Sequence, residues 1–226
     1  MFHVKQFLFS LFFIPVVGFS QHFGKTTLPL KALPALPPKH GFILQFLDST
    51  PNYNSLASVE KDWFYWTNYS RSNPKGFWDS VVTPIIASFP TLRNPNVESL
   101  KRDLYKTSPL PLVRPNITLL KASQAFAEEM AVNNASPSHT SPSGATFFDR
   151  MKKAGIVNCA AENISYGVSD PVLMLVLLYV DEGVSNLGHR LTLLNPTYTE
   201  MGIGLAKYPN NNNTIVIQDF ACVQKK

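Results

Sequence analysis

Residues 160–180 read AAENISYGVSDPVLMLVLLYV and contain both kinds of element that decide the fold. Residues 160–166 are typical of a strand. Asp170 can cap a helix that has Pro171 in its first position, because helix N-termini favour an Asx cap followed by proline. The nearly continuous apolar run from there to Val180 predicts a deeply buried helix. A strand followed directly by a buried helix indicates a mixed α and β domain.

Further elements are predicted on both sides of this stretch. Residues 201–208 and 214–223 are typical of strands, and the asparagine-rich residues 209–213 between them form a turn. Helices are predicted before the stretch at residues 58–73, 77–89, 97–105, 117–133 and 147–154. Helices between a few strands, with no internal repeat, predict an α/β or α+β domain.

The N-terminus has the layout of a secretory signal peptide. Lys5 supplies a positive charge, residues 7–17 form a short apolar core, and Gly18-Phe19-Ser20 offers a cleavage site with small residues. We therefore expect residues 1–20 to be a signal peptide and the protein to be secreted, whether extracellular or periplasmic. An uncleaved N-terminal anchor is the alternative. After cleavage we expect no stable membrane anchor.

The segment that follows differs from the rest of the chain in its proline content. Residues 21–55 contain five prolines and one short apolar patch at residues 42–46. We predict an extended proline-rich arm here, because proline interrupts regular helices and strands. Residues 56–226 then form the folded domain.

Composition and cysteine content exclude several classes. The 226-residue chain has a net charge of +5, but its 20 basic residues form no cluster, so we expect no nucleic-acid partner. Two cysteines cannot build a disulfide scaffold or a four-cysteine zinc site. In an oxidising compartment we expect Cys159 and Cys222 to pair, and a reduced buried pair is the alternative.

Two histidines and nearby acids are the candidate site. His139 and His189 lie in polar surroundings, and Glu162 and the pair Asp181-Glu182 lie between them in sequence. Two imidazoles and two carboxylates that converge in a cleft could hold a divalent cation, above all Zn²⁺, or could orient a water molecule. Ordinary hydrogen bonding by each residue is the alternative. The chain has no His-Glu-x-x-His, Gly-x-Ser-x-Gly, Walker or Cys-x-x-Cys motif.

The order of several short motifs resembles the CAP superfamily, which groups cysteine-rich secretory, antigen 5 and pathogenesis-related proteins, and within it a bacterial secreted branch. The motifs extend over residues 56–224. They are Asn68-Tyr69-Ser70-Arg71, residues 119–127, His139, Ala161-Glu162-Asn163-Ile164, Gly188-His189-Arg190, Leu194-Asn195-Pro196, Met201-Gly202-Ile203-Gly204 and the last strand into Phe220.

The resemblance implies an α+β fold, a three-layer α-β-α sandwich with a small central antiparallel sheet. It also implies a cleft in which His139, His189 and Glu162 take family positions. Relatives carry a second acid on the helix before the second histidine, and we assign it to Asp181, with Glu182 as the rival. The metal set predicted in this way is His139, Glu162, Asp181 and His189.

The resemblance leaves the function open among several classes. We favour a binding or interaction module whose cleft accepts a divalent cation, with an unidentified protein, peptide or lipid as ligand. One alternative is a peptidase-like hydrolase in which Glu162, His139 or His189 activates water on a bound metal, or in which Ser141 or Ser143 is the nucleophile. Lipid or sterol binding is a further alternative, although the apolar helix at residues 171–180 is better explained by burial in the core.

Overall fold

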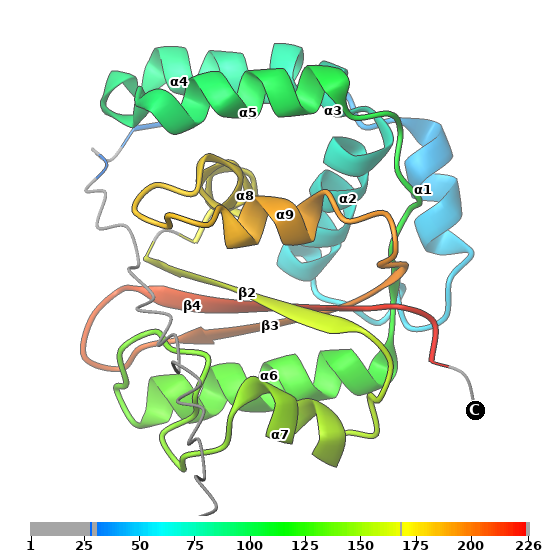
Figure 1. The fold of residues 1–226 in the computed structure, drawn as a ribbon, viewed down its shortest axis with the longest axis vertical. Coiled ribbons are helices and arrows are strands. Elements are labelled where there is room, and N and C mark those ends of the chain that lie inside the picture. The colour runs from blue at the N-terminus through cyan, green and yellow to red at the C-terminus, as the bar shows by residue number, and fades with distance from the viewer. Residues whose placement is uncertain (1–27, 29–30, 168, 225–226) are drawn as a thin grey trace, which may run out of the picture.

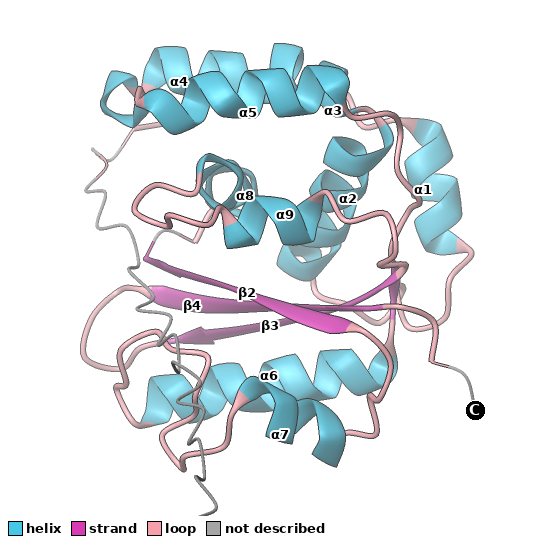
Figure 2. Ribbon diagram, in the orientation of Figure 1, coloured by secondary structure: helices cyan, strands magenta, loops and turns pink. Residues whose placement is uncertain are grey.

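The computed structural model describes Leu28, residues 31–167 and residues 169–224. The predicted signal peptide, residues 1–20, lies outside these residues and stays a prediction. Within them the chain forms a sheet with helices on both faces (Figures 1 and 2). This is the expected α+β sandwich of three layers.

The sheet has four strands in the order β1-β3-β4-β2. β2 (Ala160–Gly167), β3 (Glu200–Lys207) and β4 (Thr214–Ala221) pair antiparallel, and the two-residue β1 (Arg114–Pro115) adds to β3 in parallel. β2 is therefore an edge strand, as its place in front of the sheet shows (Figure 1).

One face of the sheet is covered by α6 (Ile117–Val132) and α7 (Phe147–Lys153). α6 packs backbone against backbone, because a Cβ on Gly202 would lie 2.2 Å from the carbonyl carbon of Leu119. A Cβ on Gly204 would lie equally close to the backbone of α6. Both glycines are therefore required by this contact, which no residue with a side chain allows.

The opposite face is covered by α2 (Ser58–Ser72), α8 (Pro171–Val180) and α9 (Gly188–Leu193) (Figure 1). The apolar run of α8 is buried, and so are Trp63 and Trp66 of α2, which confirms both as core elements. The helices between α2 and β1 lie beyond α8, on the side away from the sheet. They are α3 (Pro74–Phe77), the π-helical turn η1 (Trp78–Val82), α4 (Thr83–Ser88), the 3-10 turn η2 (Pro90–Leu92) and α5 (Pro95–Lys106).

The prediction of an extended arm before the domain is wrong for its apolar patch. Residues 42–46 belong to a helix, α1 (Gly41–Asp48), which packs on α2. Ile43 and Leu47, four residues apart, are buried in the core. The prolines of this segment lie outside α1, so burial of one apolar stripe decides the local structure.

The motif Asn68-Tyr69-Ser70-Arg71 connects α2 to segments that are distant in sequence. Asn68 forms two hydrogen bonds with the backbone of Val113, as a strand partner would. Arg71 is fully buried without a carboxylate partner among the described residues, and desolvation lowers its pKa. Its guanidinium donates to the backbone carbonyls of Pro111, Leu193, Asn195 and Tyr198.

The two cysteines form the expected disulfide. Cys159 precedes β2 and Cys222 follows β4, and their Cα atoms are 5.6 Å apart. The backbone N–H of Cys222 also donates to the carbonyl of Cys159. The bond therefore fastens the edge strand to the centre of the sheet at one end.

Candidate functional site

The first histidine of the predicted set pairs with the acid of the edge strand. His139 lies in the loop between α6 and α7, and its Nδ1 is 2.7 Å from Oε1 of Glu162. Arg150 of α7 donates to Oε2 of the same carboxylate at 2.5 Å and to the carbonyl of His139 at 2.9 Å. The Glu162 side chain is 1% exposed, whereas that of His139 is 24% exposed. Solvent therefore meets the imidazole and not the carboxylate.

A second buried carboxyl group lies beside this pair. Asp219 of β4 is directly opposite Glu162 in the sheet register and accepts a hydrogen bond from Ser123 of α6. Its Oδ1 is buried and has no hydrogen-bond partner among the described residues. Burial, followed by the charge of Glu162, raises the pKa of Asp219 well above its usual value.

This raised pKa predicts how stability depends on pH. As pH rises above the ordinary aspartate pKa of 3.8, the unfolded chain loses its proton first, while folded Asp219 keeps it. The folded state then binds more protons, so the free energy of unfolding falls until pH passes the folded pKa. We expect Asp219→Asn to remove this fall, because an amide does not ionise. Urea unfolding of both proteins at several pH values measures it, and parallel pH profiles would contradict the prediction.

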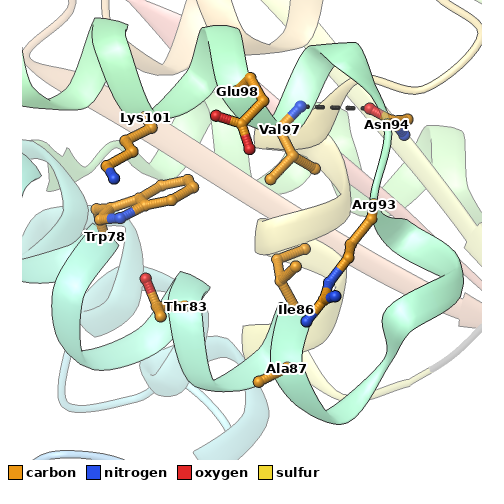
Figure 3. A pocket seen from close by; sticks show the side chains of 9 residues that line it. All are labelled: Trp78, Thr83, Ile86, Ala87, Arg93, Asn94, Val97, Glu98 and Lys101. Atoms are coloured by element: carbon orange, nitrogen blue, oxygen red, sulfur yellow. Dashed lines mark hydrogen bonds between the residues drawn. The ribbon is translucent and has the colours of Figure 1, made fainter.

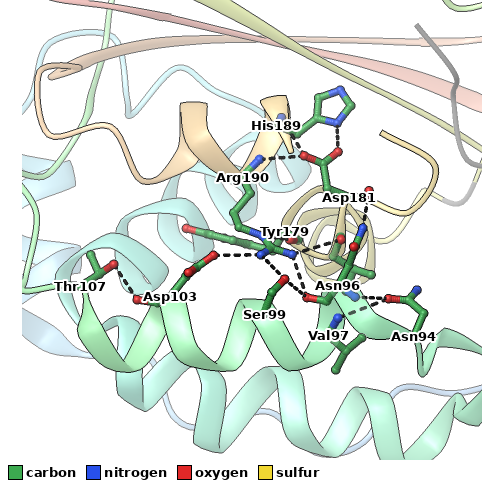
Figure 4. Close-up of polar contacts among 11 residues, drawn as sticks. Asn94, Asn96, Val97, Ser99, Asp103, Thr107, Tyr179, Asp181, His189 and Arg190 are labelled. Atoms are coloured by element: carbon green, nitrogen blue, oxygen red, sulfur yellow. Dashed lines mark hydrogen bonds and ion pairs between the residues drawn. The ribbon is translucent and has the colours of Figure 1, made fainter. Parts of the chain in front are cut away.

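The second histidine pairs with an acid on the other side of the edge strand (Figure 4). Nδ1 of His189 is 2.6 Å from Oδ1 of Asp181, whose Oδ2 accepts the backbone N–H groups of His189 and Arg190. The Asp181 side chain is fully buried and the His189 side chain is 13% exposed. Glu182, the rival second acid, is exposed. The acid that contacts His189 is thus Asp181.

The structure brings the four predicted residues together as two pairs. Glu162 faces α6 and α7, whereas the next residue, Asn163, faces α9 and donates to the carbonyl of His189 at 3.5 Å. The two pairs therefore flank the same short part of β2, one on each face. Within the described residues, no group of three or more His, Cys, Asp or Glu side chains is placed to hold a metal ion. The four-residue metal set stays a prediction.

Both pairs leave the same ring nitrogen for other contacts. Each carboxylate accepts hydrogen bonds, so each Nδ1 carries the hydrogen and the neutral ring has its lone pair on Nε2. In the described part of the chain neither Nε2 has a hydrogen-bond partner. A carboxylate on the far nitrogen is the usual support of a metal-binding imidazole. The residues therefore fit a cation at Nε2, with Glu162 and Asp181 orienting the rings.

Two supporting residues were not predicted from the sequence. Arg150 neutralises Glu162 and lies 3.4 Å from the ring centroid of Phe126, and Asp219 completes the carboxyl pair. Arg150 lies in an ordinary amphipathic helix, so nothing marked it in advance. Asp219 is an acid within an apolar strand, as Glu162 is, and that shared signal could have identified it.

The serine alternative has no support in the hydrogen bonds of this loop. Ser141 lies 2.7 Å from Ser143 and accepts the N–H of Ala145. His139 instead contacts Glu162. A nucleophile is recognised by a hydrogen bond to its base, which neither serine forms among the described residues.

None of the residues that line a small cavity belongs to either pair (Figure 3). The cavity has a volume of about 220 Å³ and lies between α4 and α5, where Trp78, Ile86 and Val97 are apolar and Arg93, Glu98 and Lys101 are charged. No residue of the apolar helix α8 lines it. Lipid or sterol binding therefore stays a prediction without support from α8.

Comparisons with known proteins agree with the observed motifs. A family model described as CAP, the cysteine-rich secretory protein family, matches residues 64–220. The uncharacterized protein YkwD of Bacillus subtilis (strain 168) is 35% identical over 88 residues, which are 38% of this chain and 32% of YkwD. This match thus spans about a third of the relative's length.

The chain is also similar to solved structures, at lower sequence identity. One is an extracellular protein containing an SCP domain from Bacillus anthracis str. Ames, with 26% identity and a TM-score of 0.43 over 56% of this chain and 38% of that one. Another is an outer surface protein from Borrelia burgdorferi, with 20% identity and a TM-score of 0.43 over 56% of this chain and 86% of that one. None of the helices in the described residues is long and apolar enough for a membrane span.

Proposed function

Because the chain belongs to the CAP family, the cysteine-rich secretory protein family, we propose that it is a secreted binding module whose two imidazoles hold a divalent cation. The observation that carries this proposal is the common arrangement of the pairs. Each Nδ1 is bonded to a buried carboxylate, and each imidazole is more exposed to solvent than the carboxylate that it contacts. Secretion rests on the signal-like residues 1–20.

The contacts of the two acids leave the imidazoles as the cation ligands. The Glu162 carboxylate is neutralised by Arg150, and the Asp181 carboxylate is bonded by backbone N–H groups. Neither acid therefore needs the metal for its own stability, and both are free to orient imidazoles. A site with two nitrogen ligands leaves positions for water or for a group of a bound ligand. Zn²⁺ is the first candidate, because imidazole suits it well.

Zinc titration by calorimetry tests the proposal. We expect the protein lacking residues 1–20 to bind one Zn²⁺, and His139→Ala and His189→Ala each to weaken binding at least tenfold, because each removes one of two ligands. His40, at the start of α1, is the matched control, and His40→Ala should bind as the parent protein does. Heats that stay unchanged in both site variants would exclude the cation.

Metal-assisted hydrolysis would use the same residues. Its support is that His139 and Glu162 form the hydrogen-bonded pair that a general base requires. Peptide turnover that Glu162→Gln abolishes in a folded protein would favour the enzyme over the binding module. An active Glu162→Gln variant would exclude Glu162 from the reaction.

A further inference from the structure

Arg190 connects the second histidine–acid pair to a helix that is distant in sequence. Its side chain is almost completely buried, and its guanidinium lies among the ends of three helices (Figure 4). It donates to Oδ2 of Asp103 at 2.9 Å, Oγ of Ser99 at 2.8 Å and the carbonyls of Asn96, Tyr179 and Val180 at 2.9, 2.8 and 3.3 Å. All three guanidinium nitrogens are therefore engaged.

These contacts hold the end of α8 and the start of α9, and the residues of the second histidine–acid pair lie at these two places. Tyr179 and Val180 are the last residues of α8, whose C-terminal carbonyls favour a cation. Arg190 is the third residue of α9. Asp181 lies between the two helices, next to Val180, and its backbone carbonyl accepts a 2.9 Å hydrogen bond from the side-chain amide of Asn96 on α5.

The backbone of this connection needs such support. Asp181 has φ of 57° and Leu187 has φ of 52°, and the left-handed region disfavours residues with a side chain. Strained residues persist where surrounding contacts fix them. For Asp181 such contacts include the hydrogen bond from Asn96 of α5 to its carbonyl, and Arg190 bonds the neighbouring carbonyls of Tyr179 and Val180.

We propose that Arg190 is a positioning residue for His189: it ties the end of α8 and the start of α9 to α5, which fixes the Asp181 carboxylate against Nδ1. An arginine also supports the His139 pair on the other side of β2, but there Arg150 acts directly, by donating to the Glu162 carboxylate and to the carbonyl of His139. The part of this proposal that concerns cation binding rests on the proposed function. The part that concerns the geometry of His189 is independent of that function.

The ion pair in this network is buried only on the arginine side, where the Arg190 side chain is 1% exposed. An ion pair with a solvent-exposed partner adds little stability, so its contribution is to fix an arrangement. The partner carboxylate of Asp103 is 45% exposed, which makes it accessible to a mild substitution. Asp103→Asn removes the charge of this partner and weakens its contact with Arg190, while Arg190 keeps its buried position.

The test is the tautomer of each histidine, measured in metal-free protein by two-bond ¹H–¹⁵N NMR. In the parent protein we expect both rings to carry hydrogen on Nδ1. In Arg190→Lys and Asn96→Ala, we expect His189 to shift towards the Nε2–H form while His139 stays unchanged. In Arg150→Lys we expect His139 to shift towards the Nε2–H form while His189 stays unchanged.

Arg71→Lys is the control for a purely structural role, because Arg71 is as buried as Arg190 and contacts neither acid of the two pairs. An unchanged His189 tautomer in Arg190→Lys and Asn96→Ala would overturn the proposal. Equal shifts in both histidines, or the same shift in Arg71→Lys, would also overturn it. Should Arg190→Lys fail to fold, Asn96→Ala and Asp103→Asn carry the test.

Zinc binding then connects this geometry to the proposed function. If the cation site exists, Arg190→Lys should weaken Zn²⁺ binding about 10–100-fold, as loss of outer support around metal ligands does. A parent protein that binds no Zn²⁺ would refute the cation, while the tautomer shifts would still decide the role of Arg190. Zn²⁺ affinity unchanged in Arg190→Lys, with the parent binding, would refute that role.

Discussion

Arg71→Met is expected to lower the free energy of unfolding by about 3–5 kcal/mol, the effect of leaving buried polar groups without their partner. Methionine fills much of the volume, but it cannot donate to the four backbone carbonyls that Arg71 satisfies. These carbonyls belong to the segment before β1, to the last residue of α9 and to the segment between α9 and β3. Urea unfolding monitored by tryptophan fluorescence measures the loss.

Arg102→Met is the matched control for this substitution. Arg102 is exposed on α5, so the same chemical change there should alter the free energy of unfolding by less than about 0.5 kcal/mol. Arg71→Lys should lie between the two, since an ammonium group reaches fewer acceptors than a guanidinium. Equal stability of Arg71→Met and Arg102→Met would show that the buried carbonyls find other donors.

Removing the disulfide is expected to have a similarly large effect. Cys159 and Cys222 are 63 positions apart, and closing a loop of this size restricts the unfolded chain by about 4 kcal/mol in the chain-entropy model. The double variant Cys159→Ser, Cys222→Ser should lose about this amount. Treating the parent protein with dithiothreitol should produce the same loss and should leave the double variant unchanged. The prediction would be contradicted if dithiothreitol left the denaturant midpoint of the parent protein unchanged.

The fold could be predicted where local pattern and tertiary burial agree. The capped apolar helix α8, the strand β2 and the β3–β4 hairpin were all evident from sequence, because burial on a sheet selects such patterns. α1 was not predicted, since prolines on either side of it suggested a structureless segment. Only contact with α2 buries Ile43 and Leu47, and that contact is not visible in the local sequence.

The site could be predicted only as a set of residue types. His139, Glu162, Asp181 and His189 were identified, and the structure joins them as two bonded pairs. Their division between the two faces of β2 depends on alternation along the strand at Glu162 and Asn163, which requires knowing what covers each face. The arginines behind the pairs come from α7 and α9, and their acceptors become neighbours only in the folded chain.

The close approach of α6 to Gly202 and Gly204 determines where the domain can open. Two backbones in van der Waals contact cannot slide past each other without a clash, so that helix and the sheet behave as one rigid block. On the opposite face the helices meet the sheet through side chains, which can change rotamer. Any side chain placed at Gly202 or Gly204 would therefore displace α6 from the sheet, whereas the opposite face can adjust by changes of rotamer.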